Sequence, residues 1–226
     1  MRVLVACEFS GIVRDAFRAR GHDAWSCDLL PSEGKPLGYW YPALYPEGHL
    51  LREKQFHYQC DIKELFPGGR IYQTSLLEGQ QVTWDLLIAH PPCTRLCNSG
   101  VRWLHERNLW GDLREGAAFF KYLLDAPVKR IAVENPREHK YARELIGRRH
   151  DQSIQPWQFG HGETKEIRLW LKNLPPLKPT NIVKGREPRV HYASPGKNRW
   201  KIRSTFYTGI ADAMADQWGI PDAIET

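Results

Sequence analysis

Two short apolar runs that end on reactive side chains constrain the fold of this chain most. One run is Trp84-Asp-Leu-Leu-Ile-Ala-His-Pro-Pro-Cys93, and the other, at 130–133, leads into Glu134-Asn-Pro136. Such runs predict buried parallel strands, and in an open α/β sheet ligands bind at the carboxyl ends of the strands. The Pro-Pro pair fixes φ twice where the chain leaves the sheet. The sequence therefore predicts that Cys93 and Glu134 face one active-site rim.

The length and composition of the chain predict one soluble domain. With 226 residues and 42% hydrophobic content, residues 1–226 can bury a single sizeable core. The five cysteines form no Cys-x-x-Cys pair, and no stretch resembles a signal peptide or a membrane span. We therefore expect reduced thiols, a cytoplasmic location in a bacterium or phage-infected cell, and no membrane or metal partner. The oligomeric state stays open, with a monomer as the expectation.

Positive charge is concentrated in one segment near the C-terminus. The whole chain has a net charge of +6, and residues 178–203 carry eight Lys or Arg against the single acid Glu187. Clustered cations bind a phosphate backbone by releasing its condensed counterions. We call residues 175–203 the basic arm and interpret it as a nucleic-acid contact; the alternative is a solvated basic loop.

The rest of the chain alternates between predicted strands and helices. Strands are expected at 2–7, 23–27, 59–62, 84–90 and 130–133, helices at 11–20, 113–124 and 137–148, and loops at 31–58 and 94–112. A β-hairpin is expected from 153–159 and 166–171. This order predicts an α/β fold with a mostly parallel sheet and helices on both faces.

The first predicted strand is followed by the turn Phe9-Ser10-Gly11, and the second by Asp28. A small-residue turn lets the backbone approach a ligand, and an acid after the second strand accepts from ribose hydroxyls. The chain lacks both Gly-x-Gly-x-x-Gly and Gly-Lys-Ser/Thr, which disfavours a pyrophosphate ligand. An adenosine that carries a sulfonium in place of phosphates suits the turn better.

Five short motifs in order resemble those of the DNA cytosine-5 methyltransferases. They are Phe9-Ser-Gly11, Pro92-Cys93, Glu134-Asn135, Arg168-Leu-Trp170 and Thr208-Gly209, and they span most of the chain. The sequence looks most like the compact forms found in phages and prophages. The resemblance implies a Rossmann-like fold that uses S-adenosyl-L-methionine, with DNA as partner and restriction protection or phage genome modification as the biological use.

The resemblance also implies a catalytic role for three residues. The thiolate of Cys93 would add to C6 of a flipped-out cytosine, and Glu134 would hold the base by N3 and its amino group. The adduct makes C5 nucleophilic, and C5 then takes the methyl group, loses its proton and expels Cys93. Arg168 would hydrogen-bond the base carbonyl or stabilise the active-site loop. Cys97 is not expected to take part.

Six residues would bind the cofactor, according to their motif positions. Phe9 would lie against the adenine, and Ser10 and Gly11 would contact the methionine part through the backbone. Asp28 would accept from the ribose hydroxyls and Asp61 from the adenine amino group. Pro92 would border the methyl group.

The chain departs from the family pattern in several motifs. Pro-Cys is followed by Thr94, Glu-Asn by Pro136, and Gly209 by Ile210, while Glu166 replaces the first Arg of the Gln-x-Arg-x-Arg motif. No target-recognition domain lies between the predicted hairpin and Thr208, so we expect short or loose sequence specificity. The residues expected to contact DNA are Arg186, Arg189, Lys197, Arg199 and Lys201 in the basic arm, and Arg95 and Arg102 in the loop after Cys93.

Three other interpretations remain open. An amino-group DNA methyltransferase, acting on N4 of cytosine or N6 of adenine, has a Pro-Pro motif like His90-Pro-Pro-Cys93, without the residue types expected at either end. A catalytically degenerate relative would bind DNA only. A zinc-dependent deaminase would use His161-Gly-Glu163, but here that motif follows the cysteine instead of preceding it.

Overall fold

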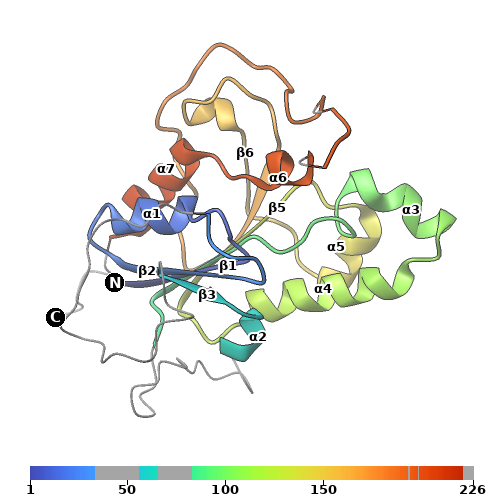
Figure 1. The fold of residues 1–226 in the computed structure, drawn as a ribbon, viewed down its shortest axis with the longest axis horizontal. Helices are drawn as coiled ribbons and strands as arrows, with labels where there is room; N and C mark the ends of the chain where they lie inside the picture. Colours follow the sequence, from blue (N-terminus) through green and yellow to red (C-terminus); the bar gives the residue numbers. More distant parts are fainter. Residues whose placement is uncertain (34–55, 66–82, 193, 198, 221–226) are drawn as a thin grey trace.

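A seven-stranded sheet forms the centre of the structure (Figure 1). The computed structural model describes residues 1–33, 56–65, 83–192, 194–197 and 199–220. Within them the strand order is β3-β2-β1-β4-β5-β7-β6, in which β1 to β5 run parallel and β7 is antiparallel to both of its neighbours. The strands are β1 (Arg2–Ala6), β2 (Asp23–Asp28), β3 (His57–Gln59), β4 (Leu86–Ala89), β5 (Arg130–Asn135), β6 (Gln152–Ile154) and β7 (Ile167–Lys172).

Helices cover both faces of this sheet because its central strands are apolar on both sides. Alternate side chains of β1 fall into two separate cores, Val3 and Val5 in one, and Leu4 and Ala6 in the other. α1 and α7 cover the first face, and α2, α4 and α5 the second (Figure 1). The helices are α1 (Ile12–Arg18), α2 (Ile62–Leu65), α3 (Val101–Glu106), α4 (Trp110–Leu124), α5 (Lys140–Ile146), α6 (Arg199–Ser204) and α7 (Thr208–Trp218).

The predicted fold class is confirmed: the fold is α/β and Rossmann-like, with a mostly parallel sheet between two helical layers. Two local predictions were wrong. β3 ends at Gln59, because the Asp61 carboxylate accepts from the Lys63 N–H (2.9 Å) and starts α2. The loop at 94–112 contains α3, which packs the fully buried Leu104 into the core. The predicted hairpin is present as the antiparallel pair β6 and β7, but its first strand is shorter than predicted, because a 3₁₀ turn at Pro156–Gln158 follows β6.

Two features of the periphery complete the description. The basic arm contains the short helix α6, and the predicted 31–58 loop lies mostly outside the described residues. Among the described helices, none has the length and apolar character needed to cross a membrane.

Candidate active site

The carboxyl ends of β4 and β5 are adjacent and carry the two residues expected to react. Ala89 pairs with Val133, so the chain leaves β4 at His90 beside Glu134. The Asn135 amide donates to the Pro91 carbonyl (3.0 Å), which fastens the Cys93 segment to β5. Cys93 and Glu134 are close enough that the Glu134 charge contributes to raising the pKa of Cys93. The two predicted residues therefore share one site.

His90 is a third member of this site. Its Nδ1 lies 3.2 Å from Oε2 of Glu134, and both side chains are 12% exposed. The imidazole also packs on Phe206, with 4.7 Å between ring centroids. Its Nε2 is buried and has no hydrogen-bond partner among the described residues. His90 thus contacts one carboxylate oxygen of Glu134 through Nδ1. Its other ring nitrogen, Nε2, makes no hydrogen bond to the described residues.

The chain after Cys93 forms a compact turn that contains a second cysteine. The Cys93 carbonyl accepts from the N–H groups of Leu96 and Cys97, both at 3.0 Å. Cys97 is 6% exposed, and its Sγ lies 3.0 Å from the Ser99 hydroxyl. The backbone of Cys97 therefore helps to fix the segment that carries the predicted nucleophile.

Arg168, on β7, lies on the opposite face of the sheet from Glu134, on β5. In the sheet register it pairs with Asn135, whereas Glu134 pairs with Leu169. Its guanidinium binds the Glu138 carboxylate (2.8 Å) and the Glu166 carboxylate (2.7 Å). Glu138 is 4% exposed and its backbone bridges to Cys97. Of the two roles implied for Arg168, this arrangement favours support of the loop that carries the cysteines.

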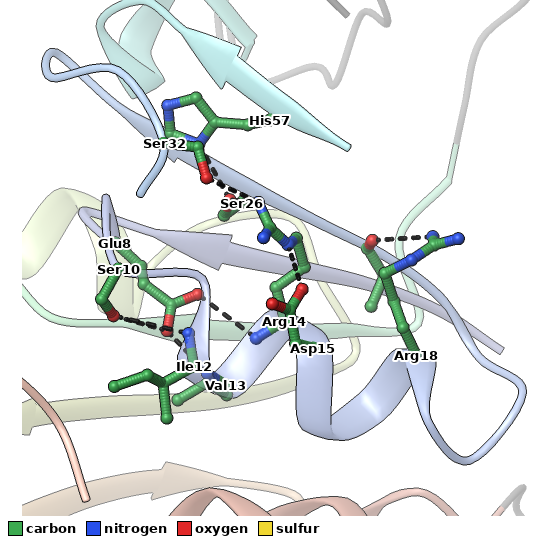
Figure 2. A network of polar contacts seen from close by, with 11 residues as sticks. Glu8, Ser10, Ile12, Val13, Arg14, Asp15, Arg18, Ser26, Ser32 and His57 are labelled. Atoms are coloured by element: carbon green, nitrogen blue, oxygen red, sulfur yellow. Dashed lines mark hydrogen bonds and ion pairs between the residues drawn. The ribbon is translucent and has the colours of Figure 1, made fainter. Parts of the chain in front are cut away.

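The turn after β1 places a buried carboxylate at the start of α1 (Figure 2). Glu8 accepts from the backbone N–H groups of Val13 (2.7 Å) and Arg14 (3.2 Å). Burial raises the pKa of this carboxyl, which is 4% exposed. A helix N-terminus attracts anions, and here the chain's own carboxylate already takes its donors. This end of α1 is therefore not available to a phosphate.

Beside Glu8, a buried arginine joins α1 to β2 (Figure 2). Arg14 is 1% exposed and donates to the hydroxyls of Ser26 (3.1 Å) and Ser32 (3.0 Å). Ser26 in turn contacts Nδ1 of His57 on β3 at 2.8 Å. Gly11 has a φ of 72°, and a Cβ there would collide with the Arg14 guanidinium. The network thus fixes the turn through Ser10 and Gly11.

The ends of β1, β2 and β3 bring together the acids expected to bind a nucleoside. Burial, followed by the charges of Asp28 and Asp61, raises the pKa of Cys7 to about 12, so both carboxylates lie near this residue. Cys7 itself has a φ of 58°, an uncommon conformation that occurs often at ligand sites. Burial raises the pKa of Asp28 as well.

Phe9 is covered by the basic arm. It is 8% exposed, and its ring centroid lies 5.7 Å from that of Trp200 on α6. Next to this contact, Lys201 binds the Glu33 carboxylate at 2.6 Å. Pro92 is exposed and Pro91 buried. These positions put an aromatic surface, two acids and a small-residue turn at the ends of three adjacent strands.

This donor set fits S-adenosyl-L-methionine better than it fits a dinucleotide. Asp28 and Asp61 can accept from hydroxyl and amino groups, and the Phe9 ring, which packs against Trp200, is the aromatic group beside them. The Glu8 carboxyl already accepts from the first N–H groups of α1, which disfavours a phosphate at this helix end.

The cations expected to contact DNA differ in how they are held. Arg95 pairs with Asp112, Arg102 with Glu106, and Arg189 with Glu163 and Glu187. Arg186 stacks on Trp157 with 3.9 Å to the ring centroid. Lys197 is exposed, Arg199 is half-buried, and neither takes part in an ion pair recorded for the described residues.

Several site residues were not identified from the sequence. His90, Glu138 and Cys97 stand beside predicted residues in the chain, but nothing in their spacing indicates their partners. Lys165 lies near Cys93 and favours its thiolate, while its ammonium group donates to the Arg203 carbonyl (3.0 Å). The only feature of the sequence that could have pointed to Lys165 is its position in the altered Thr164-Lys-Glu-Ile-Arg168 motif.

The residues needed for a zinc-dependent deaminase are engaged elsewhere. Nε2 of His161 accepts from the Gly209 N–H (3.0 Å), at the start of α7. Glu163 lies 3.5 Å from Arg189. In the described part of the chain, no group of three or more His, Cys, Asp or Glu side chains is arranged to hold a metal ion.

Comparisons with known proteins give distant matches at the level of structure. No family model matches the sequence, and no curated protein matches it either. Among solved structures, one similar chain is a candidate DNA modification methyltransferase encoded within a prophage of E. coli. The sequence identity is 14% and the TM-score 0.45, over 86% of this chain and 55% of that chain. The chain thus spans about half the length of this structural relative.

Proposed function

We propose that the protein is a DNA methyltransferase that methylates C5 of a flipped-out cytosine through a covalent Cys93 adduct. The observation that carries this proposal is the shared site of Cys93 and Glu134 at the ends of β4 and β5, tied together by His90 and Asn135. Covalent addition to an electron-poor ring requires a thiol beside a proton donor. The order of the five motifs along the chain agrees with this chemistry.

In this proposal, each residue of the site has a defined task. The Cys93 thiolate bonds to C6 while the Glu134 carboxyl, held at one oxygen by His90, donates to N3 of the base. S-Adenosyl-L-methionine, held by Phe9, Ser10, Gly11, Asp28, Asp61 and Pro92, supplies the methyl group when bound. Once C5 is methylated, a base removes the C5 proton, and the electron pair of that C–H bond forms the C5=C6 double bond and expels the Cys93 thiolate from C6. Arg168 acts through Glu138 to keep the cysteine loop in place.

The substrate is proposed to be DNA because of the basic arm. Arg186, Arg189, Lys197, Arg199 and Lys201, together with Arg95 and Arg102, would contact phosphates. A base in a duplex reaches Cys93 only after extrusion, which costs a few kcal/mol. The turn from Cys93 to α3 is the element we propose to brace the gap. Residues 1–226 would act as one catalytic unit in the cytoplasm.

Trapping on DNA tests the covalent step directly. With a substrate that contains 5-fluorocytosine, elimination is blocked, so the wild-type chain should form a complex that survives denaturation. Cys93→Ser should abolish this complex while binding of S-adenosyl-L-methionine, measured by calorimetry, is retained. A chain that binds cofactor and DNA but is never trapped contradicts the proposal.

The amino-group alternative gives a different product. It is favoured by one observation: Nε2 of His90, at the start of the Pro-Pro segment, has no hydrogen-bond partner among the described residues and can accept from an exocyclic amino group. Mass analysis of digested DNA from cells that express the chain separates the two: 5-methylcytosine supports the proposed reaction, and N4-methylcytosine or N6-methyladenine supports the alternative. A degenerate relative would leave all bases unmodified.

A further inference from the structure

The contact between Trp200 and Phe9 carries an inference about the regulation of the cofactor site, and this inference rests on the proposed function. Phe9 is the aromatic residue proposed to lie against the adenine, and it is 8% exposed. The Trp200 ring packs against it, with 5.7 Å between the ring centroids and 49° between the ring planes. Because so little of Phe9 is open to solvent, an adenine can reach its ring only if a covering group moves away.

Of the two rings in this contact, Trp200 is the one that is free to move. The turn that carries Phe9 is fixed, because the Glu8 carboxyl accepts from the start of α1 and the Phe9 carbonyl accepts from the Glu33 N–H (2.8 Å). Trp200, on the short helix α6, is 53% exposed. A half-exposed side chain loses few contacts when it swings outward. Trp200 is therefore the group that an adenine would displace.

α6 is held firmly at its C-terminal end, close to the catalytic residues. The ammonium group of Lys165 donates to the Arg203 carbonyl (3.0 Å). Phe206, two residues beyond the helix, is buried and packs on the His90 ring with 4.7 Å between centroids. This end of α6 can therefore serve as the fixed point of a pivot.

The N-terminal half of α6 is held more loosely. Lys201 binds the Glu33 carboxylate at 2.6 Å, but both side chains are more than 40% exposed. Exposed ion pairs contribute little to stability, because water and salt screen them. A competing anion can therefore take Lys201 from Glu33, and with that exchange the Trp200 end of the helix loses its polar contact to the cofactor turn.

We propose that Trp200 is a plug in the cofactor site and that DNA withdraws it. Lys201 follows Trp200 directly, and Lys197 and Arg199 precede it, so three of the cations proposed to contact phosphates flank the plug. A phosphate bound to Lys201 replaces Glu33 as its partner and draws α6 away from Phe9. DNA then raises the affinity for the cofactor. The cofactor raises the affinity for DNA by the same factor, because coupling between two binding sites is reciprocal.

Binding of S-adenosyl-L-homocysteine to the full chain, measured by calorimetry, tests the plug. This nucleoside has the adenosine of the cofactor and no methyl group to transfer. Trp200→Ala should bind it about 2- to 10-fold more tightly than the wild type, because the competing aromatic pair is gone. The matched variant Tyr192→Ala removes an exposed aromatic of the same arm, one that packs on His191, and should leave the affinity unchanged. Equal or weaker binding by Trp200→Ala overturns the proposal.

The same titration with a saturating short DNA duplex tests the coupling. DNA should raise the affinity of the wild type for the nucleoside and leave that of Trp200→Ala unchanged. Glu33→Gln removes the carboxylate that holds Lys201 and keeps both rings, so without DNA its affinity should lie between those of the wild type and Trp200→Ala. A wild type that binds equally well with and without DNA, or a coupling that persists in Trp200→Ala, overturns the proposal.

These titrations separate the plug from the proposed reaction. Tighter binding by Trp200→Ala, in a chain that is never trapped on 5-fluorocytosine DNA, supports the plug and contradicts the cytosine reaction. Normal trapping, together with equal affinities of wild type and Trp200→Ala, supports the reaction and contradicts the plug. A chain that binds the nucleoside in none of its variants contradicts both.

Discussion

Nδ1 of His90 lies 3.2 Å from Oε2 of Glu134, and both side chains are nearly buried. The contact joins the residue that follows β4 to a residue near the end of β5, so it orients the proposed base-binding carboxylate. His90→Ala should reduce kcat about 10- to 100-fold, since a misplaced proton donor loses part of the 10²–10⁴-fold effect of acid catalysis. Steady-state methylation measures this loss.

A second histidine offers a control for that variant. His22→Gln changes a histidine at the opposite end of the sheet, where Asp23 begins β2. It should leave kcat unchanged. Equal loss of activity in both variants would point to a general defect in folding and would contradict the assigned role of His90.

Cations of the basic arm should differ in their contribution to DNA binding. Lys197→Gln should weaken binding and lower the slope of log K against log salt by about 0.9, the value for one phosphate contact. Arg189→Gln should have a smaller effect, because its guanidinium is already shared between Glu163 and Glu187. Fluorescence anisotropy at several salt concentrations compares the two. Identical slopes in both variants and the wild type would argue against the arm as a DNA contact.

Glu8 should give the folded state a distinct pH dependence. Burial raises its pKa above the ordinary 4.5, so between these two values the folded chain binds more protons than the unfolded one. The stabilisation from this group is complete below pH 4.5 and is lost as pH rises through the folded pKa. In Glu8→Gln the dependence disappears, so the stability advantage of the wild type should shrink with rising pH. Urea unfolding at a series of pH values measures it, and a constant difference would contradict the assignment.

Two glycines should respond in opposite ways to alanine. A Cβ on Gly209 would collide with the Phe159 carbonyl oxygen, so Gly209→Ala must displace backbone and should cost on the order of 2–4 kcal/mol. Gly111 in α4 has no atom within 4 Å of the same position, and Gly111→Ala should stabilise by about 0.5–1 kcal/mol. Thermal unfolding distinguishes them. A neutral Gly209→Ala would show that this contact is not tight.

The sequence alone determined the main layers of the fold and the ends of its central strands. The runs at β4 and β5 are apolar at successive positions, and such a run is stable only in a strand that is covered on both faces. This pattern predicted the α/β class and placed Cys93 and Glu134 at the ends of two strands. The 3₁₀ turn before β7 was not predicted, because Pro156 and Gln158 continue an alternating pattern that reads as a strand.

Only the tertiary structure decided which side chains meet. Arg168 and Glu134 were both predicted to be catalytic residues of one site. The antiparallel pairing of β5 with β7 places their side chains on opposite faces of the sheet. Cys97 lies in a turn that a backbone bridge joins to Glu138, and His90 meets Glu134 because β4 and β5 pair in one register. The hydrophobic pattern of a strand can be read from neighbouring residues in the sequence. Hydrogen-bond partners, in contrast, depend on strand register and on turns that bring distant residues together.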